Sequence, residues 1–454
     1  MNSPTPSLAA RLRTLHRLLP GDDFGVDAAA ALLDQDTDTT TAAITELVAA
    51  GVLEVSGTPA PADACAPAGD PTRRYRATGQ SRQPVLELPA DAEDKDALYR
   101  VLGYLLRHCA AVAARLAPGE HRFVELPELP VFADDRAALG WFAAERTCVL
   151  GAQRVAYALK DLPLTWKFAD AAYPALHHAR RHDDLMAVND LGATAADQLD
   201  HPVAGVLLAR IGASHNALGR YADAEAAAQQ ALAQARRHRH PRSRFLAHTV
   251  LGGARRGLRQ YDLALAQFHA ARDVNAAGES DPTGTPTGPD GRATSADTAG
   301  GLLAAEIALT HLAAGERTAA VDHAYQAVEQ LPRDAPRRDR AHVLTVLGCV
   351  LTAAGDAAEA IVTLHAAAGL LDPDTDPVDL ARVKQALADA DAALGDYEQA
   401  GRDRDDAIRL YHHAGHDHPA HKARQQPDPS IRARDTGDHR DSDAPNGPTT
   451  PEVP

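Results

Sequence analysis

The chain has 454 residues, with 46 lysines and arginines against 62 aspartates and glutamates, which gives a formal charge of −16. This length suffices for about three domains and a sizeable buried core. The acidic balance argues against general affinity for nucleic acids or other polyanions, which would need a local basic patch. Aromatic residues make up only 4% of the chain, which argues against a β-sandwich or barrel and favours closely packed, alanine-rich helices.

The four cysteines are widely separated in the chain and form no CxxC pair, so we expect free thiols and a cytoplasmic protein. No apolar segment precedes the first charged residues, so we expect no signal peptide. No apolar run reaches the ~18 residues that a membrane-spanning helix needs, so we expect no contact with a membrane.

The N-terminal part of the chain predicts a small domain of three helices and a β-hairpin. Leucines recur at helical spacing up to Leu19, and Pro20 and Gly21 end that helix. Gly51 stands where a left-handed residue closes the third helix. Three helices followed by a hairpin are typical of a winged helix, so we assign residues 7–79 to a winged-helix-like domain. The predicted elements are helices over 8–19, 26–33 and 37–50 and strands over 52–55 and 73–76.

The middle of the chain predicts a helical connector. A long amphipathic helix is predicted over residues 94–116, and it ends before Pro118. From Asp134 onward, nearly every segment has the apolar periodicity of a helix. We therefore assign residues 93–160 to a helical connector and residues 161–411 to helical repeats.

Five units in the second half of the chain share one register. Each starts from a small anchor residue, with a glycine or an aromatic residue seven to nine positions later and an alanine twelve positions later. Successive anchors are 40 residues apart, except for one step of 56 residues. The additional residues of that step are rich in Gly, Pro, Thr and Ser, which predicts a disordered insertion at about residues 277–300. The anchors are Gly212, Gly252, Ala308, Gly348 and Ala388.

This register predicts pairs of antiparallel helices. A small anchor residue allows the two helices to approach closely, and the alanines of the second helix let it nest against the first. A single pair cannot bury its apolar face alone, so neighbouring pairs stack into a solenoid. The predicted fold is therefore mainly α, an α-solenoid that follows the small N-terminal domain. Residues 412–454 are rich in His, Asp, Arg and Pro without apolar periodicity, which predicts a disordered tail.

The best-defined repeat unit resembles the tetratricopeptide repeat (TPR) family. The positions that carry the resemblance are Gly212, Gly219, Tyr221, Ala224 and Ala231. The units here are longer than the usual ~34 residues, which implies longer helices or turns. The resemblance implies a TPR-type α-solenoid in which the first helix of each pair lines a concave surface that binds peptides or proteins.

The N-terminal region is similar to part of the bacterial STAND regulators. Residues 18–24, 46–54 and 74–76 resemble the winged helix that follows their nucleotide-binding NB-ARC module. Residues 98–116 and 138–146 resemble the helical connector that joins this winged helix to TPR repeats. The chain thus resembles the C-terminal half of such a regulator, without the NTPase module.

The nucleotide-binding residues of that family have no counterparts in this chain. No GxxxxGKS or GxxxxGKT motif occurs, so no phosphate-binding loop is expected. Where the family carries Met-His-Asp, this chain has Ala77, Thr78 and Gly79. We therefore expect no binding of ATP or ADP and no other cofactor.

The expected concave surface carries a set of polar side chains. They lie within two turns of each anchor, at positions that face the groove in the family that the repeats resemble. Side chains of this kind suit the backbone or the acidic side chains of a bound peptide. The candidates for this peptide groove are Asn216, Thr249, Arg256, His342, Thr345, Thr352, Arg382, Gln385 and Asp389.

No catalytic or metal-binding residue is assigned. The chain has neither GxSxG nor HExxH, and Cys148 and Cys349 fit small buried apolar positions in helices. His178 and His182 have the i, i+4 spacing of a metal-binding pair, but we interpret them as solvated polar residues. The histidines within residues 412–421 could bind a transition metal opportunistically.

The sequence therefore predicts a non-enzymatic TPR scaffold or regulator that binds a protein or peptide in signal transduction or transcriptional regulation. The alternative is a winged-helix transcription factor with a TPR domain for sensing or dimerisation. Its recognition helix would be residues 37–50, which contain no Arg or Lys but carry Asp38 and Glu46. Only arginines of the predicted wing could contact phosphates, so nucleic acid is the less favoured partner. The sequence leaves homo-oligomerisation open.

Overall fold

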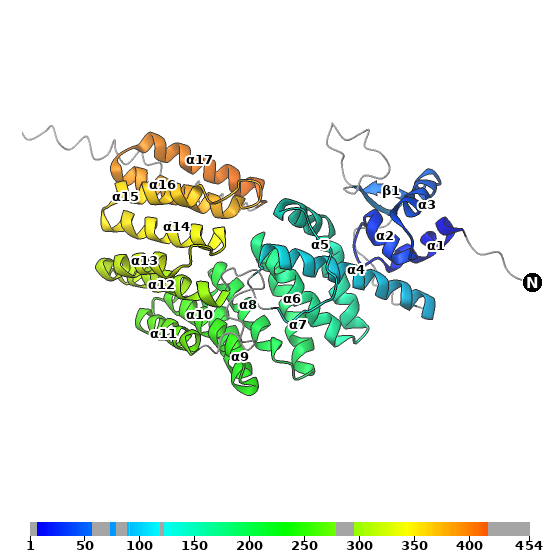
Figure 1. The fold of residues 1–454 in the computed structure, drawn as a ribbon, viewed down its shortest axis with the longest axis horizontal. Coiled ribbons are helices and arrows are strands. Elements are labelled where there is room, and N and C mark those ends of the chain that lie inside the picture. The colour runs from blue at the N-terminus through cyan, green and yellow to red at the C-terminus, as the bar shows by residue number, and fades with distance from the viewer. Residues whose placement is uncertain are drawn as a thin grey trace, which may run out of the picture. The chain divides into compact units, whose positions relative to one another are not determined.

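The computed structural model describes residues 7–56, 73–78, 89, 91–118, 122–277 and 295–415. The chain divides into two compact units, Met1–Leu303 and Ala304–Pro454. Helices make up most of the described part of each unit (Figure 1). This composition, with the paired helices described below, confirms the predicted mainly α, TPR-type solenoid. Most of the predicted insertion and of the predicted tail lies outside the described residues.

The N-terminal elements form as the sequence predicts, with small shifts at their ends. The first predicted helix divides into an α-helix and a 3₁₀ turn, and the side chain of Asp36 caps α3 by accepting a hydrogen bond from the Thr39 backbone. The two strands pair antiparallel, with Val55 opposite Tyr75. Their assignment to a winged helix stays a prediction. The elements are α1 (Leu8–Leu15), η1 (His16–Leu18), α2 (Val26–Leu33), α3 (Thr37–Ala49), β1 (Leu53–Ser56) and β2 (Arg74–Ala77).

These elements pack directly on the connector helices α4 (Ala92–Leu116) and α5 (Asp135–Ala158). Gly151 of α5 lies so close to Pro20 that a Cβ atom would overlap the Pro20 carbonyl oxygen. Arg100 of α4 donates hydrogen bonds to the carbonyls at the end of α2. One continuous apolar core therefore runs from the N-terminal helices into the connector and the first repeats.

Three antiparallel helix pairs follow in the first unit. Each pair is joined by a tight turn, and successive pairs stack because α7 packs on α8, α9 on α10, and α8 on α10. The pair α6–α7 precedes the five units of the sequence register and adds a further repeat. The helices are α6 (Leu162–His178), α7 (His182–Gln198), α8 (Val203–Ala217), α9 (Tyr221–His238), α10 (Pro241–Gly257) and α11 (Tyr261–Ala276).

The remaining helices show that two predicted boundaries, the end of the insertion and the start of the tail, were misplaced. Helix α12 begins at Ser295, inside the predicted insertion, because its buried positions already start at Thr298 and continue through Leu303. Helix α17 continues to His413, past the predicted start of the tail, because buried Tyr411 anchors its last turn. The helices are α12 (Ser295–Ala314), α13 (Arg317–Gln330), α14 (Arg337–Ala354), α15 (Ala357–Ala368), α16 (Pro377–Leu394) and α17 (Tyr397–His413).

Close helix contacts at the glycine anchors confirm the role that the sequence predicts for them. A Cβ atom on Gly252 would lie 2.6 Å from the ring of Phe268, and one on Gly348 would lie 2.5 Å from Leu364. The residue seven positions after an anchor closes the first helix in the left-handed conformation, as Gly355 does with a φ of 105°. In the second repeat, Arg259 takes this conformation with a φ of 61°. None of the described helices combines the length and apolar character that crossing a bilayer requires.

The anchors generate a stability prediction. Gly252→Ala should destabilise the protein by about 1–3 kcal/mol, because the new methyl group must displace the ring of Phe268. Gly401→Ala is the control: Gly401 lies in α17 with no atom within 4 Å of the added Cβ, so it should stabilise by about 0.5–1 kcal/mol. Urea unfolding of both variants measures the difference. An unchanged midpoint for Gly252→Ala would contradict close packing at the anchor.

Candidate functional site

The N-terminal unit offers two features that a DNA-binding protein could use, helix α3 and the arginines of β2. The described surface of α3 is acidic, since Asp36, Asp38 and Glu46 are all exposed. Hydrogen bonds from Thr39 hold the pKa of Asp36 below its usual value, so this carboxylate keeps its charge. A helix with this surface repels phosphates rather than binding them.

Arg74 is built into the contact between β2 and the connector. Its side chain is only 11% exposed, pairs with the carboxylate of Asp23 at 2.9 Å, and forms a second ion pair with Glu145 of α5. Arg76 pairs with Glu54 across the hairpin at 2.6 Å. Both guanidinium groups are therefore engaged by carboxylates, and Arg74 stabilises the docking of the N-terminal elements on α5.

The first unit carries three of the nine predicted groove residues. The side chain of each one contacts either a neighbouring helix or its own helix. The side-chain amide of Asn216 donates a hydrogen bond to the Val250 carbonyl at 2.8 Å and so joins α8 to α10. Thr249 donates to a carbonyl of its own helix. The guanidinium of Arg256 lies 5.9 Å from the ring centre of Phe268. In this unit, Asn216 joins two repeats, whereas Thr249 and Arg256 make contacts within one repeat.

The second unit brings the other six predicted residues onto two adjacent helices, α14 and α16, which pack against each other. His342 and Arg382 occupy equivalent positions on the two helices and are exposed. Thr345 and Thr352 are half-buried, and each hydroxyl donates to a carbonyl one turn earlier. Gln385 accepts a hydrogen bond from Tyr411 at 2.8 Å, so part of its polar capacity is used within the hairpin.

Asp389 lies near Cys349, a residue outside the predicted groove set. Burial and, to a smaller extent, the negative charge of Asp389 raise the pKa of Cys349 to about 11, against the lowering effect of Arg382. Asp389 retains contact with solvent, yet desolvation raises its pKa against the opposing effect of Arg404. His342, Arg382 and Asp389 therefore offer hydrogen-bond donors and acceptors on one pair of packed helices, the α14–α16 surface. The register could have identified Cys349, because it follows the anchor Gly348 by one residue, as Asp389 follows the anchor Ala388.

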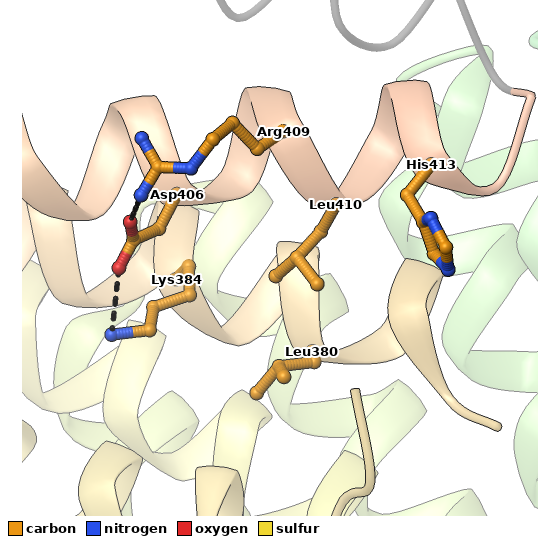
Figure 2. Close-up of a pocket in the computed structure, with 6 residues that line it drawn as sticks. All are labelled: Leu380, Lys384, Asp406, Arg409, Leu410 and His413. Atoms are coloured by element: carbon orange, nitrogen blue, oxygen red, sulfur yellow. Dashed lines mark hydrogen bonds and ion pairs between the residues drawn. The ribbon is translucent and has the colours of Figure 1, made fainter. Parts of the chain in front are cut away.

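A shallow pocket between α16 and α17 lies on the last described hairpin (Figure 2). Leu380 and Leu410 form its apolar part, while Asp406 bridges Lys384 and Arg409 beside them. Both apolar and charged side chains therefore line this pocket.

Among the described residues, no group of three His, Cys, Asp or Glu side chains could hold a metal ion. The interpretation of His178 as a solvated residue is wrong, because its side chain is buried in α6, whereas His182 begins α7. His177 stacks on Tyr173 at 5.3 Å between ring centres. The histidines after residue 415 lie outside the described part of the chain.

Comparisons with known proteins give only distant likenesses. No family model matches the chain, and no curated protein matches it. A STAND protein with a TPR sensor from Pyrococcus horikoshii aligns at 13% identity and a TM-score of 0.49, over 92% of this chain and 53% of that one. BtubC from P. vanneervenii aligns at 16% identity and a TM-score of 0.38, over 60% and 99%.

A third solved structure is the Rap protein complexed with competence and sporulation factor. It aligns at 10% identity and a TM-score of 0.41, over 66% of this chain and 88% of that one. At these TM-scores the likenesses establish neither the arrangement of the repeats nor a function. The fold class of this chain rests on its own antiparallel helix pairs.

The role of Arg74 in docking generates a second prediction. Glu145→Ala should destabilise the protein by about 3–5 kcal/mol, because it leaves a guanidinium with a missing partner in a buried site. Glu54→Ala, which breaks the more exposed pair with Arg76, should cost under about 1 kcal/mol. Thermal unfolding of the two variants makes the comparison. Equal losses of stability in the two variants would contradict the proposed role of the buried Arg74 ion pairs in docking.

Proposed function

We propose that this chain is a non-enzymatic scaffold whose α14–α16 surface binds an extended peptide segment of a partner protein. The observation that supports this most is the placement of His342, Arg382 and Asp389 on two helices fixed by the packing of their pairs. These side chains are exposed, while the helices that carry them pack against their neighbours. A preorganised surface loses little conformational entropy on binding, which favours affinity.

The chemistry of the α14–α16 surface suits a peptide that carries both signs of partial charge. The planar guanidinium of Arg382 can donate two parallel hydrogen bonds to a carboxylate or to backbone carbonyls. Asp389 can accept hydrogen bonds from backbone N–H groups. The hydroxyl oxygens of Thr345 and Thr352, whose protons are already donated within α14, remain acceptors. An extended peptide offers these complementary groups along one edge.

Two of the described thiols, those of Cys148 and Cys349, support a non-enzymatic role. A cysteine nucleophile acts as the thiolate and therefore needs a lowered pKa. Burial raises the pKa of Cys349 to about 11 and raises the pKa of Cys148 well above its usual value. Both side chains are therefore protonated near neutral pH and fit structural positions.

The second candidate function, DNA binding through a winged helix, has less support. The acidic exposed face of α3 and the ion pairs of Arg74 and Arg76 leave this unit poorly suited to phosphates. In our proposal the winged-helix-like unit is a packing module that caps the connector. A cytoplasmic regulator in signal transduction or transcriptional control is the setting that this arrangement suits best.

The proposal predicts that charge reversal on the α14–α16 surface abolishes partner binding. The test uses the full-length double variant Arg382→Glu, Asp389→Arg in affinity capture from the native extract, followed by direct titration of the captured partner. The matched control is Glu398→Arg, Arg402→Glu, which reverses an exposed ion pair on α17. Loss of one charge-assisted contact costs about 1.5–3 kcal/mol, so affinity should fall by at least about tenfold.

The wild type and the control should bind the same partner with equal affinity, and thermal unfolding should confirm that all three proteins are folded. Two results would refute the proposal. One is a partner that binds the surface variant as tightly as the wild type, and the other is a failure of the wild type to capture any saturable partner.

A further inference from the structure

The connection between α4 and α5 contains an extended segment, residues 122–133, which we call the strap. It forms neither helix nor strand. At one end Arg122 donates to the carbonyls of Ala113 and Ala117 at the end of α4. At the other end the ring of Phe132 lies 6.1 Å from that of Trp141 in α5. The strap is thus attached at both ends to the connector helices.

Between these ends, the strap backbone is bound by a side chain of the first repeat. One carboxylate oxygen of Asp170 in α6 accepts hydrogen bonds from the backbone N–H groups of Phe123 and Val124, at 2.9 and 3.2 Å. The other oxygen pairs with Arg210 of α8 at 3.0 Å. The side chains of Asp170 and Arg210 are only 1% and 6% exposed. The guanidinium of Arg210 in turn lies over the ring of Tyr173 at 3.9 Å.

The side chain of Phe123 enters a site lined by aromatic rings from successive repeats. Its ring centre lies 5.9 Å from that of His201, just before α8, and 5.4 Å from that of His240, which caps α10. His201 stacks on Trp166 of α6 at 4.6 Å. The neighbouring Val124 is 5% exposed. One aromatic and one aliphatic side chain of the strap are therefore held across the first helices of three repeats.

The register places Asp170 at a groove position. Tyr173 stands 39 residues before the anchor Gly212, and left-handed Arg180 follows it by seven residues, as Gly219 follows Gly212. Asp170 precedes this anchor position by three residues, the spacing by which Thr249 precedes Gly252 and Thr345 precedes Gly348. Paired recognition of successive backbone N–H groups, with a recess for one side chain, is a general mode of extended-peptide binding.

Beyond this site part of the strap is exposed, while Leu126, Leu129 and Phe132 pack against the core. Val131 is 95% exposed, and Glu128 has a φ of 53°, a left-handed conformation that residues other than glycine adopt at a cost. Release of the strap would relieve that conformation while exposing the carboxylate of Asp170.

We propose that residues 122–126 are a tethered ligand in a peptide subsite formed by α6, α8 and α10, and that an external peptide of the same chemistry displaces them. The competing peptide is extended and presents an aromatic residue followed by an aliphatic one. The backbone N–H groups of these two residues donate hydrogen bonds to Asp170. This inference goes beyond the proposed function, because the subsite belongs to different helices from the α14–α16 surface.

The test replaces residues 122–126 by Gly-Ser-Gly-Ser-Gly in the full chain. The probe is a fluorescein-labelled synthetic peptide with the sequence of residues 121–129, followed by fluorescence anisotropy. The replaced variant should bind the probe saturably. The wild type should bind it at least about tenfold more weakly, because a tethered segment competes at a high effective concentration.

Two controls distinguish specific recognition of the peptide from non-specific binding. In the replaced variant, Asp170→Asn should abolish binding, whereas Asp197→Asn, which alters an exposed carboxylate on α7, should leave it unchanged. A probe N-methylated at the amides that correspond to Phe123 and Val124 keeps its side chains but loses both donors. This probe should fail to bind, and equal binding of both probes would overturn the proposal.

If the replaced variant does not fold, hydrogen exchange on the wild type tests whether the strap can leave its site. The amides of Phe123 and Val124 should exchange faster than those in the middle of α6, because the strap opens without unfolding the repeats. Exchange of these amides only through global unfolding would make the strap a permanent part of the core and would overturn the proposal. Because this test involves neither Arg382 nor Asp389, its failure leaves binding at the α14–α16 surface unaffected.

Discussion

Close approach between antiparallel helices is the constraint on which the rest of this structure depends. At Gly252 and Gly348, the space beside the Cα atom is filled by Phe268 and Leu364 of the partner helix. Because protein interiors are close-packed, this contact fixes the spacing within each pair. Fixed pairs stack with their first helices adjacent, α8 on α10 and α14 on α16. The side chains of the candidate surfaces therefore take their positions from the packing of small residues beneath them.

The helix pairs could be predicted from sequence because their determinants are local and periodic. A small anchor recurs in each unit, and the structure gives the residue seven positions after it a left-handed conformation, even where that residue is Arg259. The pair α6–α7 escaped the register because Tyr173 stands at its anchor position, where its ring packs against Arg210. The strap escaped it too, because an extended segment held by the side chain of Asp170 leaves no periodic pattern.

The positions of the candidate site could be predicted, but the partners of its residues could not. Register alone placed Asn216 and Gln385 correctly on first helices, whereas their hydrogen bonds to Val250 and Tyr411 depend on contacts between helices. The same holds for Arg74, whose carboxylate partners Asp23 and Glu145 are 51 and 71 residues away in sequence. A basic residue on a predicted wing suggested a phosphate contact, and long-range pairing gave it a structural role instead.

The central claim is that a partner protein binds on the first helices of the second unit. Site-specific photo-crosslinking in the native cell tests it most directly, with benzoylphenylalanine placed at Thr345 on α14 or at Val362 on α15, which is 70% exposed. The account predicts a discrete crosslinked adduct from position 345 and none from position 362. Adducts from position 362 alone, or the same adducts from both positions, would contradict it.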